Sequence, residues 1–234
     1  MTGAPGRPSR IETVLLDAGG VLLDLDYAFL GRLLEIRGHA VRVSDLARAE
    51  AVSRAAVDRR VREGGTTADG WRDYFRILLR EAGTPVEIRE TIIDILWEAH
   101  ESVGLWTVPA AGAPEIVRQL KDLGFRLGVV SNAEGNVQRD LDVAGYDGMF
   151  GTVVDSHLVG VEKPDPAIFR IALERLHSDP RTAVHVGDVP AIDVEGSRAA
   201  GIAPVLLDRF DLYPSLGVAR LRSIAELPGW LADA

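Results

Sequence analysis

The sequence predicts an α/β fold, a doubly wound parallel sheet interrupted by an inserted all-helical domain. Two patterns predict this class. From about residue 104 onwards, short runs of Val, Leu and Ile alternate with amphipathic segments, which is the pattern of βαβ units. The apolar run before Asp17 is separated from these units by a long stretch of helical periodicity, far longer than one crossover helix requires.

The first predicted strand covers residues 13–16 and stops at Asp17, which Ala18, Gly19 and Gly20 follow. A short run of Val and Leu closed by two glycines is typical of a buried parallel strand. Ligands bind at the carboxyl edge of open α/β sheets, so Asp17 is a candidate nucleophile or metal ligand, with helix capping as the alternative. Residues 1–10 are polar and rich in Gly and Pro, and we expect a disordered tail there.

Residues 27–103 are expected to form a helical cap domain, which leaves residues 11–26 and 104–234 as the α/β core. The insertion is rich in Arg, Glu, Ala and Leu, and its apolar residues recur at helical spacing. Four helices are expected in it, over residues 27–38, 44–63, 68–82 and 85–102.

The core continues with strands alternating with helices. The expected strands cover residues 125–131, 152–155, 183–188 and 203–207, and the expected helices cover 113–123, 165–177 and 192–200. His185 lies inside one of the apolar strand runs. We therefore expect it to be a hydrogen-bonded core histidine rather than a ligand.

Composition excludes several classes of function. The chain has 234 residues, a formal net charge of −9 and no cysteine. Without cysteine, a metal would have to be held by oxygen or imidazole ligands. The negative charge argues against nucleic acid or an anionic membrane as a partner. No stretch reaches the ~18 apolar residues of a membrane span, and no apolar leader segment is present, so we expect a cytoplasmic protein.

Polar residues stand near the ends of four predicted strands. They are Asp17, Ser131, Lys163 and the pair Asp188 and Asp193. Because the carboxyl ends of parallel strands share one sheet edge, we expect these side chains to converge.

These residue types suit phosphoryl transfer. Carboxylates hold hard divalent cations, and magnesium is the usual partner of a phosphate. The carboxylate of Asp17 could accept the phosphoryl group as an aspartyl phosphate. Lys163 would offset negative charge, and the Ser131 hydroxyl with nearby backbone N–H groups would bind phosphate oxygens.

Four motifs occur in a fixed order along the chain. They are Asp17-Ala18-Gly19-Gly20-Val21, Val130-Ser131-Asn132, Lys163-Pro164-Asp165-Pro166 and Gly187-Asp188-Val189-Pro190-Ala191-Ile192-Asp193. In type, order and spacing they resemble the motifs of the haloacid dehalogenase-like (HAD) hydrolase superfamily. The insertion resembles the cap of its helical-cap subfamily. The resemblance spans the chain from the first predicted strand to the last and implies a Rossmann-like core.

The resemblance implies a role for each motif residue and a small phosphorylated metabolite as substrate. The implied nucleophile is Asp17. The implied phosphate ligands are Ser131, Asn132 and Lys163, and Lys163 is also implied to be catalytic. The implied Mg²⁺ ligands are Asp17, Gly19 through its carbonyl, Asp188 and Asp193.

The first motif departs from the family's phosphatases at Gly19. Those enzymes normally have a second Asp there, which protonates the leaving oxygen and then activates water. General acid–base catalysis typically contributes about 10² to 10⁴ in rate. The departure predicts a leaving group that needs no acid, a substitute residue elsewhere, or low activity.

Three alternatives to a magnesium-dependent phosphatase are open. They are a metal-independent 2-haloacid dehalogenase, a catalytically impaired fold with a binding or regulatory role, and a phosphotransferase. The dehalogenase branch shares the Asp-Ala start but does not keep the metal-binding acids, which are present here as Asp188 and Asp193. The phosphonatase branch needs a cap lysine, whereas Lys121 and Lys163 both lie outside the predicted cap.

Overall fold

The computed structural model of the protein describes residues 8, 10–65 and 70–233. The chain divides into two compact units, one formed by Met1–Asp24 with Thr107–Ala234 and the other by Leu25–Trp106. We refer to them as the α/β unit and the helical unit. The tail expected over residues 1–10 falls almost entirely outside the described residues, as does the start of the helix expected from residue 68.

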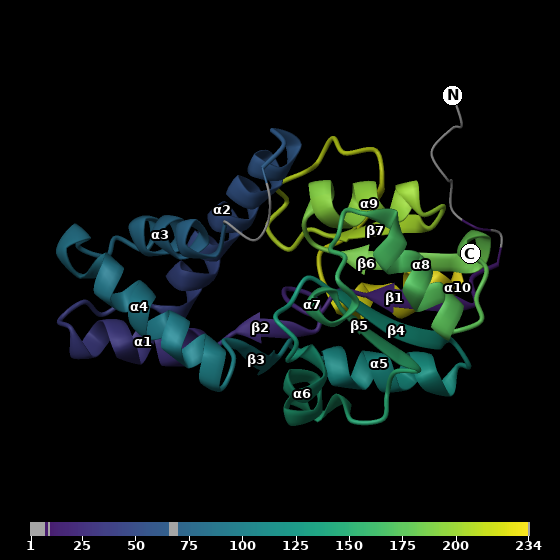
Figure 1. Ribbon diagram of the computed structural model, residues 1–234, viewed down its shortest axis with the longest axis horizontal. Helices are drawn as coiled ribbons and strands as arrows, with labels where there is room; N and C mark the ends of the chain where they lie inside the picture. The colour runs from purple at the N-terminus through teal and green to yellow at the C-terminus, as the bar shows by residue number, and fades with distance from the viewer. Residues whose placement is uncertain (1–7, 9, 66–69, 234) are drawn as a thin grey trace. The chain divides into compact units, whose positions relative to one another are not determined.

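A six-stranded sheet forms the centre of the α/β unit (Figure 1). Its strand order is β5-β4-β1-β6-β7-β8, and every neighbouring pair is parallel. The strands are β1 (Thr13–Leu16), β4 (Arg126–Ser131), β5 (Thr152–Asp155), β6 (Ala183–Gly187), β7 (Ala203–Leu207) and β8 (Ala219–Leu221). The order runs outwards from β1 in both directions, so the predicted doubly wound parallel sheet is confirmed. The edge strand β8 was not predicted.

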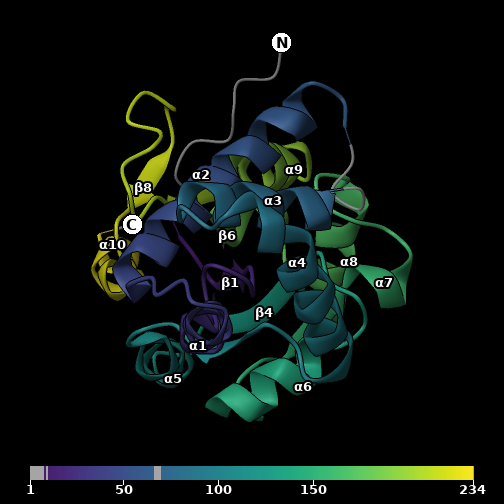
Figure 2. The same cartoon turned by 90° about the vertical axis from the view of Figure 1, so that its left-hand side faces the viewer.

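Helices cover both faces of this sheet. In Figures 1 and 2, α8 (Pro166–Arg175) and α9 (Glu195–Ala199) lie on the side opposite α5 (Ala113–Asp122) and α6 (Val137–Leu141). On the α8 side, Leu15, Val130 and Val154 of three adjacent strands pack against the apolar side chains of α8. This packing fixes the strands whose carboxyl ends carry the candidate site residues.

Shorter elements complete the α/β unit. The α8 helix begins as predicted, with Asp165 Oδ1 accepting from the Ala167 N–H at 2.9 Å. The helix expected over residues 192–200 instead starts earlier, with a π-helical turn that runs into α9. The remaining elements are α7 (Ser156–Val159), α10 (Leu227–Ala232), the π-helical turns Asp142–Tyr146 and Pro190–Val194, and the 3₁₀ turns Pro180–Thr182 and Ile224–Glu226. A separate pair of strands, β2 (Leu23–Leu25) and β3 (Trp106–Pro109), lies where the chain passes between the two units.

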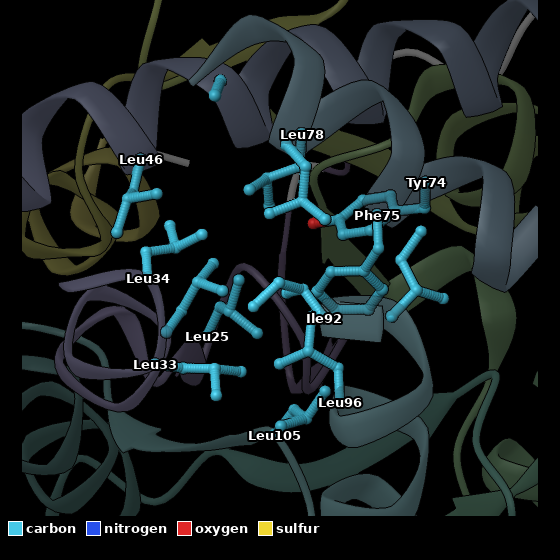
Figure 3. Close-up of a cluster of buried hydrophobic side chains, with 14 residues drawn as sticks. Leu25, Leu33, Leu34, Leu46, Tyr74, Phe75, Leu78, Ile92, Leu96 and Leu105 are labelled. Atoms are coloured by element: carbon cyan, nitrogen blue, oxygen red, sulfur yellow. The ribbon is translucent and has the colours of Figure 1, made fainter. Parts of the chain in front are cut away.

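The helical unit consists, in its described residues, of four helices and their connections. They are α1 (Tyr27–Ile36), α2 (Val43–Arg62), α3 (Trp71–Glu81) and α4 (Val86–Ser102). Side chains from all four helices meet in one buried cluster, which includes Leu34, Leu46, Phe75 and Leu96 (Figure 3). Apolar residues at helical spacing are therefore the internal core of this unit.

Among the described helices, none is both long and apolar enough to cross a membrane.

The helical unit also buries a carboxylate, Glu50 of α2. It accepts hydrogen bonds from the hydroxyls of Tyr27 and Tyr74, and Arg54 Nη2 lies 2.7 Å from its Oε1. Burial alone would raise the pKa of Glu50, but Arg54 and the two hydroxyls together lower it. Arg54 is thus paired with a buried carboxylate inside the unit.

Candidate active site

Three predicted site residues stand where neighbouring strands end. Asp17 follows β1 directly, Ser131 is the last residue of β4, and Asp188 follows β6 directly. Strand β1 lies between β4 and β6, and all three strands are parallel. Carboxylate oxygens of Asp17, Asp188 and Asp193 lie within 4.8 Å of one another at this edge.

The carboxylate of Asp17 is held by a partner on each oxygen. Its Oδ1 accepts the Ala18 N–H at 2.7 Å, and its Oδ2 lies 2.8 Å from Lys163 Nζ. The Asp17 N–H donates to the Val186 carbonyl at 2.9 Å, which extends the pairing of β1 with β6 by one residue. The side chain is 13% exposed. Asp17 therefore has a fixed orientation and limited access to solvent.

Lys163 places its ammonium between two carboxylates. Its Nζ lies 2.8 Å from Asp17 Oδ2 and 2.8 Å from Asp193 Oδ1, and its side chain is 1% exposed. The backbone of Lys163 is clamped by the Asn132 side chain, which donates from Nδ2 to the Lys163 carbonyl at 2.9 Å and accepts the Lys163 N–H at 2.7 Å. The Asn132 amide thus positions the Lys163 backbone, and the phosphate-binding role that the resemblance implies for Asn132 stays a prediction.

Each of the two carboxylate oxygens of Asp193 accepts two hydrogen bonds. Besides Lys163, Oδ1 accepts from His185 Nε2 at 3.0 Å, while Oδ2 accepts the N–H groups of Asp188 and Val189 at 3.1 and 3.0 Å. Asp193 is thereby tied both to the buried lysine and to the loop that carries Asp188. Direct contact with a cation would require it to give up a donor.

Gly187 makes room for this arrangement. A Cβ atom at Gly187 would lie 2.1 Å from Asp193 Cγ and 2.3 Å from Asp193 Cβ. The glycine of the fourth motif is therefore needed because the Asp193 side chain crosses directly over its backbone. The sequence singled out the neighbouring acids but gave no reason for this glycine.

The chain after Ser131 is ordered by a buried acid that sequence reasoning did not single out. Asp155, in register with Ser131 on β5, accepts the N–H groups of Gly135, Val137 and His157 at 3.0 to 3.3 Å. Its place at a strand end, like that of Asp17, was the only signal available. Ser131 is itself buried at the end of β4.

A tight turn follows Asp17. The Ala18 carbonyl accepts the N–H groups of Leu22 and Leu23 at 2.8 and 2.9 Å, and Gly20 has a φ of 78°. That left-handed conformation favours glycine at position 20. Gly19 does not share the positive φ, so its backbone does not itself require a glycine.

Burial and pairing shift the pKa values of this cluster in opposite directions. Burial raises the pKa of Asp17, and Lys163 only partly opposes it. Burial alone would also raise the pKa of Asp193, but Lys163 and His185 lower that pKa below its usual range. Burial would lower the pKa of Lys163, yet the two carboxylates raise it. Counting Asp188, the cluster holds three carboxylates and one ammonium, which leaves an excess of negative charge.

The donor set fits a hard divalent cation. Such ions take carboxylate oxygens, and Mg²⁺ commonly uses one or two carboxylates together with substrate oxygens. Asp17 and Asp188 supply two such groups within 4.8 Å. A cation there would also offset the excess negative charge of the cluster.

The family of the chain follows from a match to a known family model. The model, described as a haloacid dehalogenase-like hydrolase, matches residues 11–201, a range that includes all four motifs and every residue of the cluster. The chain belongs to the haloacid dehalogenase-like hydrolases. The resemblance inferred from the motifs is confirmed.

Several curated relatives are similar to this HAD-like hydrolase over about 60% of its length. Haloacid dehalogenase-like hydrolase domain-containing protein 3 of Mus musculus is 35% identical over 62% of this chain and 57% of that protein. A phosphoserine phosphatase of Thermus thermophilus is 33% identical over 64% and 61%. A glyceraldehyde 3-phosphate phosphatase of Methanopyrus kandleri is 33% identical over 58% of each chain. The matched regions span less than two thirds of these relatives.

Solved structures agree on the fold of the HAD-like hydrolase. A putative HAD-hydrolase, YfnB of Bacillus subtilis bound to magnesium, has a TM-score of 0.66 at 22% identity and covers 96% of this chain and 100% of its own. The L-2-haloacid dehalogenase RSc1362 has a TM-score of 0.65 at 18% identity, with coverage of 96% and 100%. At these identities the likeness concerns the fold alone.

The close approach at Gly187 predicts that Gly187→Ala lowers the free energy of unfolding by about 1–3 kcal/mol, the usual cost of overpacking. The methyl group would displace Asp193 from Lys163 and from the Asp188 loop. Chemical denaturation measures the change. Gly229→Ala is the matched control, since a Cβ atom added at Gly229 would meet no other atom within 4 Å. Equal stability of the two variants would contradict the packing described here.

Proposed function

We propose that this HAD-like hydrolase is a magnesium-dependent phosphatase that acts on a small phosphorylated metabolite through an aspartyl phosphate at Asp17. The observation that carries the proposal is the cluster in which Asp17 and Asp193 share the Lys163 ammonium, with Asp188 alongside. Relatives named as phosphoserine, glyceraldehyde 3-phosphate and phosphoglycolate phosphatases support this substrate class.

The proposed magnesium ligands are Asp17, Asp188 and the Gly19 carbonyl. Asp193 would position the ligands without contacting the ion itself, because it already accepts four hydrogen bonds. Two of these bonds hold the loop that carries Asp188. Magnesium supplies charge neutralisation between phosphate and carboxylates when it is bound. This assignment divides the two acids of the fourth motif between ligation and positioning.

The chain's own residues account for the covalent steps. An Asp17 oxygen forms a bond to phosphorus while the bond between phosphorus and the leaving oxygen breaks, and the leaving group takes its proton from solvent. Water then attacks phosphorus, the bond to Asp17 breaks, and inorganic phosphate leaves with the carboxylate restored. Lys163 offsets charge near the phosphoryl group, and the Ser131 hydroxyl binds a phosphate oxygen.

Gly19 sets the limit of this mechanism. A glycine offers no side chain to protonate the leaving oxygen, so the first step depends on the stability of the leaving group as an anion. Acyl and aryl phosphates are therefore the preferred substrates in this proposal, ahead of sugar phosphates.

The proposal predicts that Asp17→Asn reduces magnesium-dependent release of phosphate from an aryl phosphate to background. The substitution removes the nucleophile and one ligand charge while changing little volume. Phosphate release is measured alongside circular dichroism, with exposed Asp122 in the Asp122→Asn variant as the control. A folded Asp17→Asn protein that still releases phosphate would refute the assignment. Release of halide from a 2-haloacid in the presence of a chelator would select the dehalogenase alternative.

A further prediction concerns Gly19→Asp. A carboxylic acid two residues after the nucleophile should raise turnover of alkyl phosphates by ~10²-fold, the lower end of what a positioned acid supplies. The gain should be small for aryl phosphates, whose leaving groups need no acid. Turnover of both substrate types is measured at matched magnesium occupancy.

The Gly19→Asn variant separates proton transfer from side-chain size, because its amide has nearly the same shape and no acidic proton. The backbone of Gly19 lacks a positive φ, so neither variant incurs left-handed backbone strain. If Gly19→Asp folds, binds magnesium and gains no more on alkyl phosphates than Gly19→Asn, the glycine is not a missing acid.

A further inference from the structure

His185 lies in the middle of β6, where every residue is buried. Its ring packs edge-on against Phe169, with ring centroids 4.9 Å apart. A wholly buried imidazole among Val and Ala is costly unless its polar atoms are hydrogen-bonded. The expected hydrogen-bonded core histidine is confirmed, and among the described residues its hydrogen-bond partner is Asp193 of the candidate site.

The hydrogen bond defines which ring nitrogen carries the proton. An ionised carboxylate only accepts, so His185 Nε2 must donate to Asp193 Oδ1 across 3.0 Å. The other nitrogen, Nδ1, is buried and has no hydrogen-bond partner among the described residues. Among the described residues, the hydrogen bonding of the ring is therefore confined to a single oxygen, Asp193 Oδ1.

That oxygen is the one that also binds Lys163. Asp193 Oδ1 lies 2.8 Å from Lys163 Nζ, and the same ammonium lies 2.8 Å from Asp17 Oδ2. A continuous chain of contacts thus leads from His185 through Asp193 and Lys163 to the proposed nucleophile. The second carboxylate oxygen is held by two backbone N–H groups, and His185 supplies the second donor to Oδ1.

We propose that His185 is a positioning residue, which fixes Asp193 Oδ1 so that the Lys163 ammonium is held against Asp17. Its effect on turnover rests on the proposed phosphatase function, while its effect on the position of Lys163 does not. The two consequences can therefore be measured separately. A residue that only filled space in β6 would produce neither of them.

The sharpest test compares His185→Gln with His185→Met. The two side chains have the same length, and Gln Nε2 stands as many bonds from Cα as the imidazole Nε2. Both variants lose the ring packed on Phe169, but only Gln keeps an N–H donor. We expect kcat for an aryl phosphate to fall about 10- to 100-fold in His185→Met, the effect of losing one hydrogen bond to a charged group. His185→Gln should recover most of this loss, with little change of KM in either variant.

A second measurement requires no turnover. The chain has two lysines, Lys121 and Lys163, so ¹⁵N-lysine labelling gives two side-chain ammonium signals. Lys163 is buried, whereas Lys121 is exposed and bonds the Gly148 carbonyl. Hydrogen exchange of the Lys163 ammonium should be slow in the unmodified protein and in His185→Gln, and at least about 10-fold faster in His185→Met. Exchange at Lys121 should not change.

The outcomes separate the two proposals. If the unmodified protein cleaves no phosphate ester, the phosphatase function fails while the exchange experiment still decides the role of His185. If His185→Met matches His185→Gln in both kcat and exchange, His185 only packs, and the inference is overturned. If His185→Met does not fold, His185→Phe retains a ring against Phe169 without a donor and must show the same fast exchange and low kcat.

Discussion

The buried ammonium of Lys163, shared between Asp17 and Asp193, is the interaction on which the site depends. Taking three charges out of water is costly, and attraction between them offsets that cost only if their geometry is held tightly. The three residues come from widely separated parts of the chain. Each has a further restraint: the Ala18 N–H on Asp17, the Asn132 clamp on the Lys163 backbone, and three more donors on Asp193.

The parallel sheet makes this geometry possible. Strands β4, β1 and β6 are neighbours that run in one direction, so residues that follow them emerge at a common edge. A sheet packed by helices on both faces holds those ends in place. At that edge the chain carries Gly19, where the resemblance to the family's phosphatases would place a second Asp.

Much of the fold and the positions of the site residues could be predicted from the sequence, because they follow from local patterns of residue type. Apolar runs that stop at Asp17, Ser131 and Asp188 predict both strands and strand ends, and the topology follows from alternation with helices. The edge strand β8 was missed because Ala219–Leu221 is too short to show any period. The family resemblance supplied what local patterns do not, namely roles for residues far apart in the chain.

The hydrogen-bond roles could not be predicted, since they depend on which side chains meet in space. Nothing local indicates that the Asn132 amide clamps Lys163, that Asp193 is saturated by four donors, or that Gly187 must leave room for it. A histidine in an apolar strand was correctly expected to be hydrogen-bonded. Its partner could be known only once β6 and the turn that follows it were placed.

The central claim is that Asp17 accepts a phosphoryl group with magnesium bound beside it. Beryllofluoride mimics a phosphoryl group on a carboxylate, so ¹⁹F NMR of the protein with beryllofluoride tests the claim without knowledge of the substrate. The account predicts a bound fluoride signal that requires magnesium, disappears with a chelator and is absent from Asp17→Asn. A signal that persists in Asp17→Asn, or none in the unmodified protein at saturating magnesium, would contradict it.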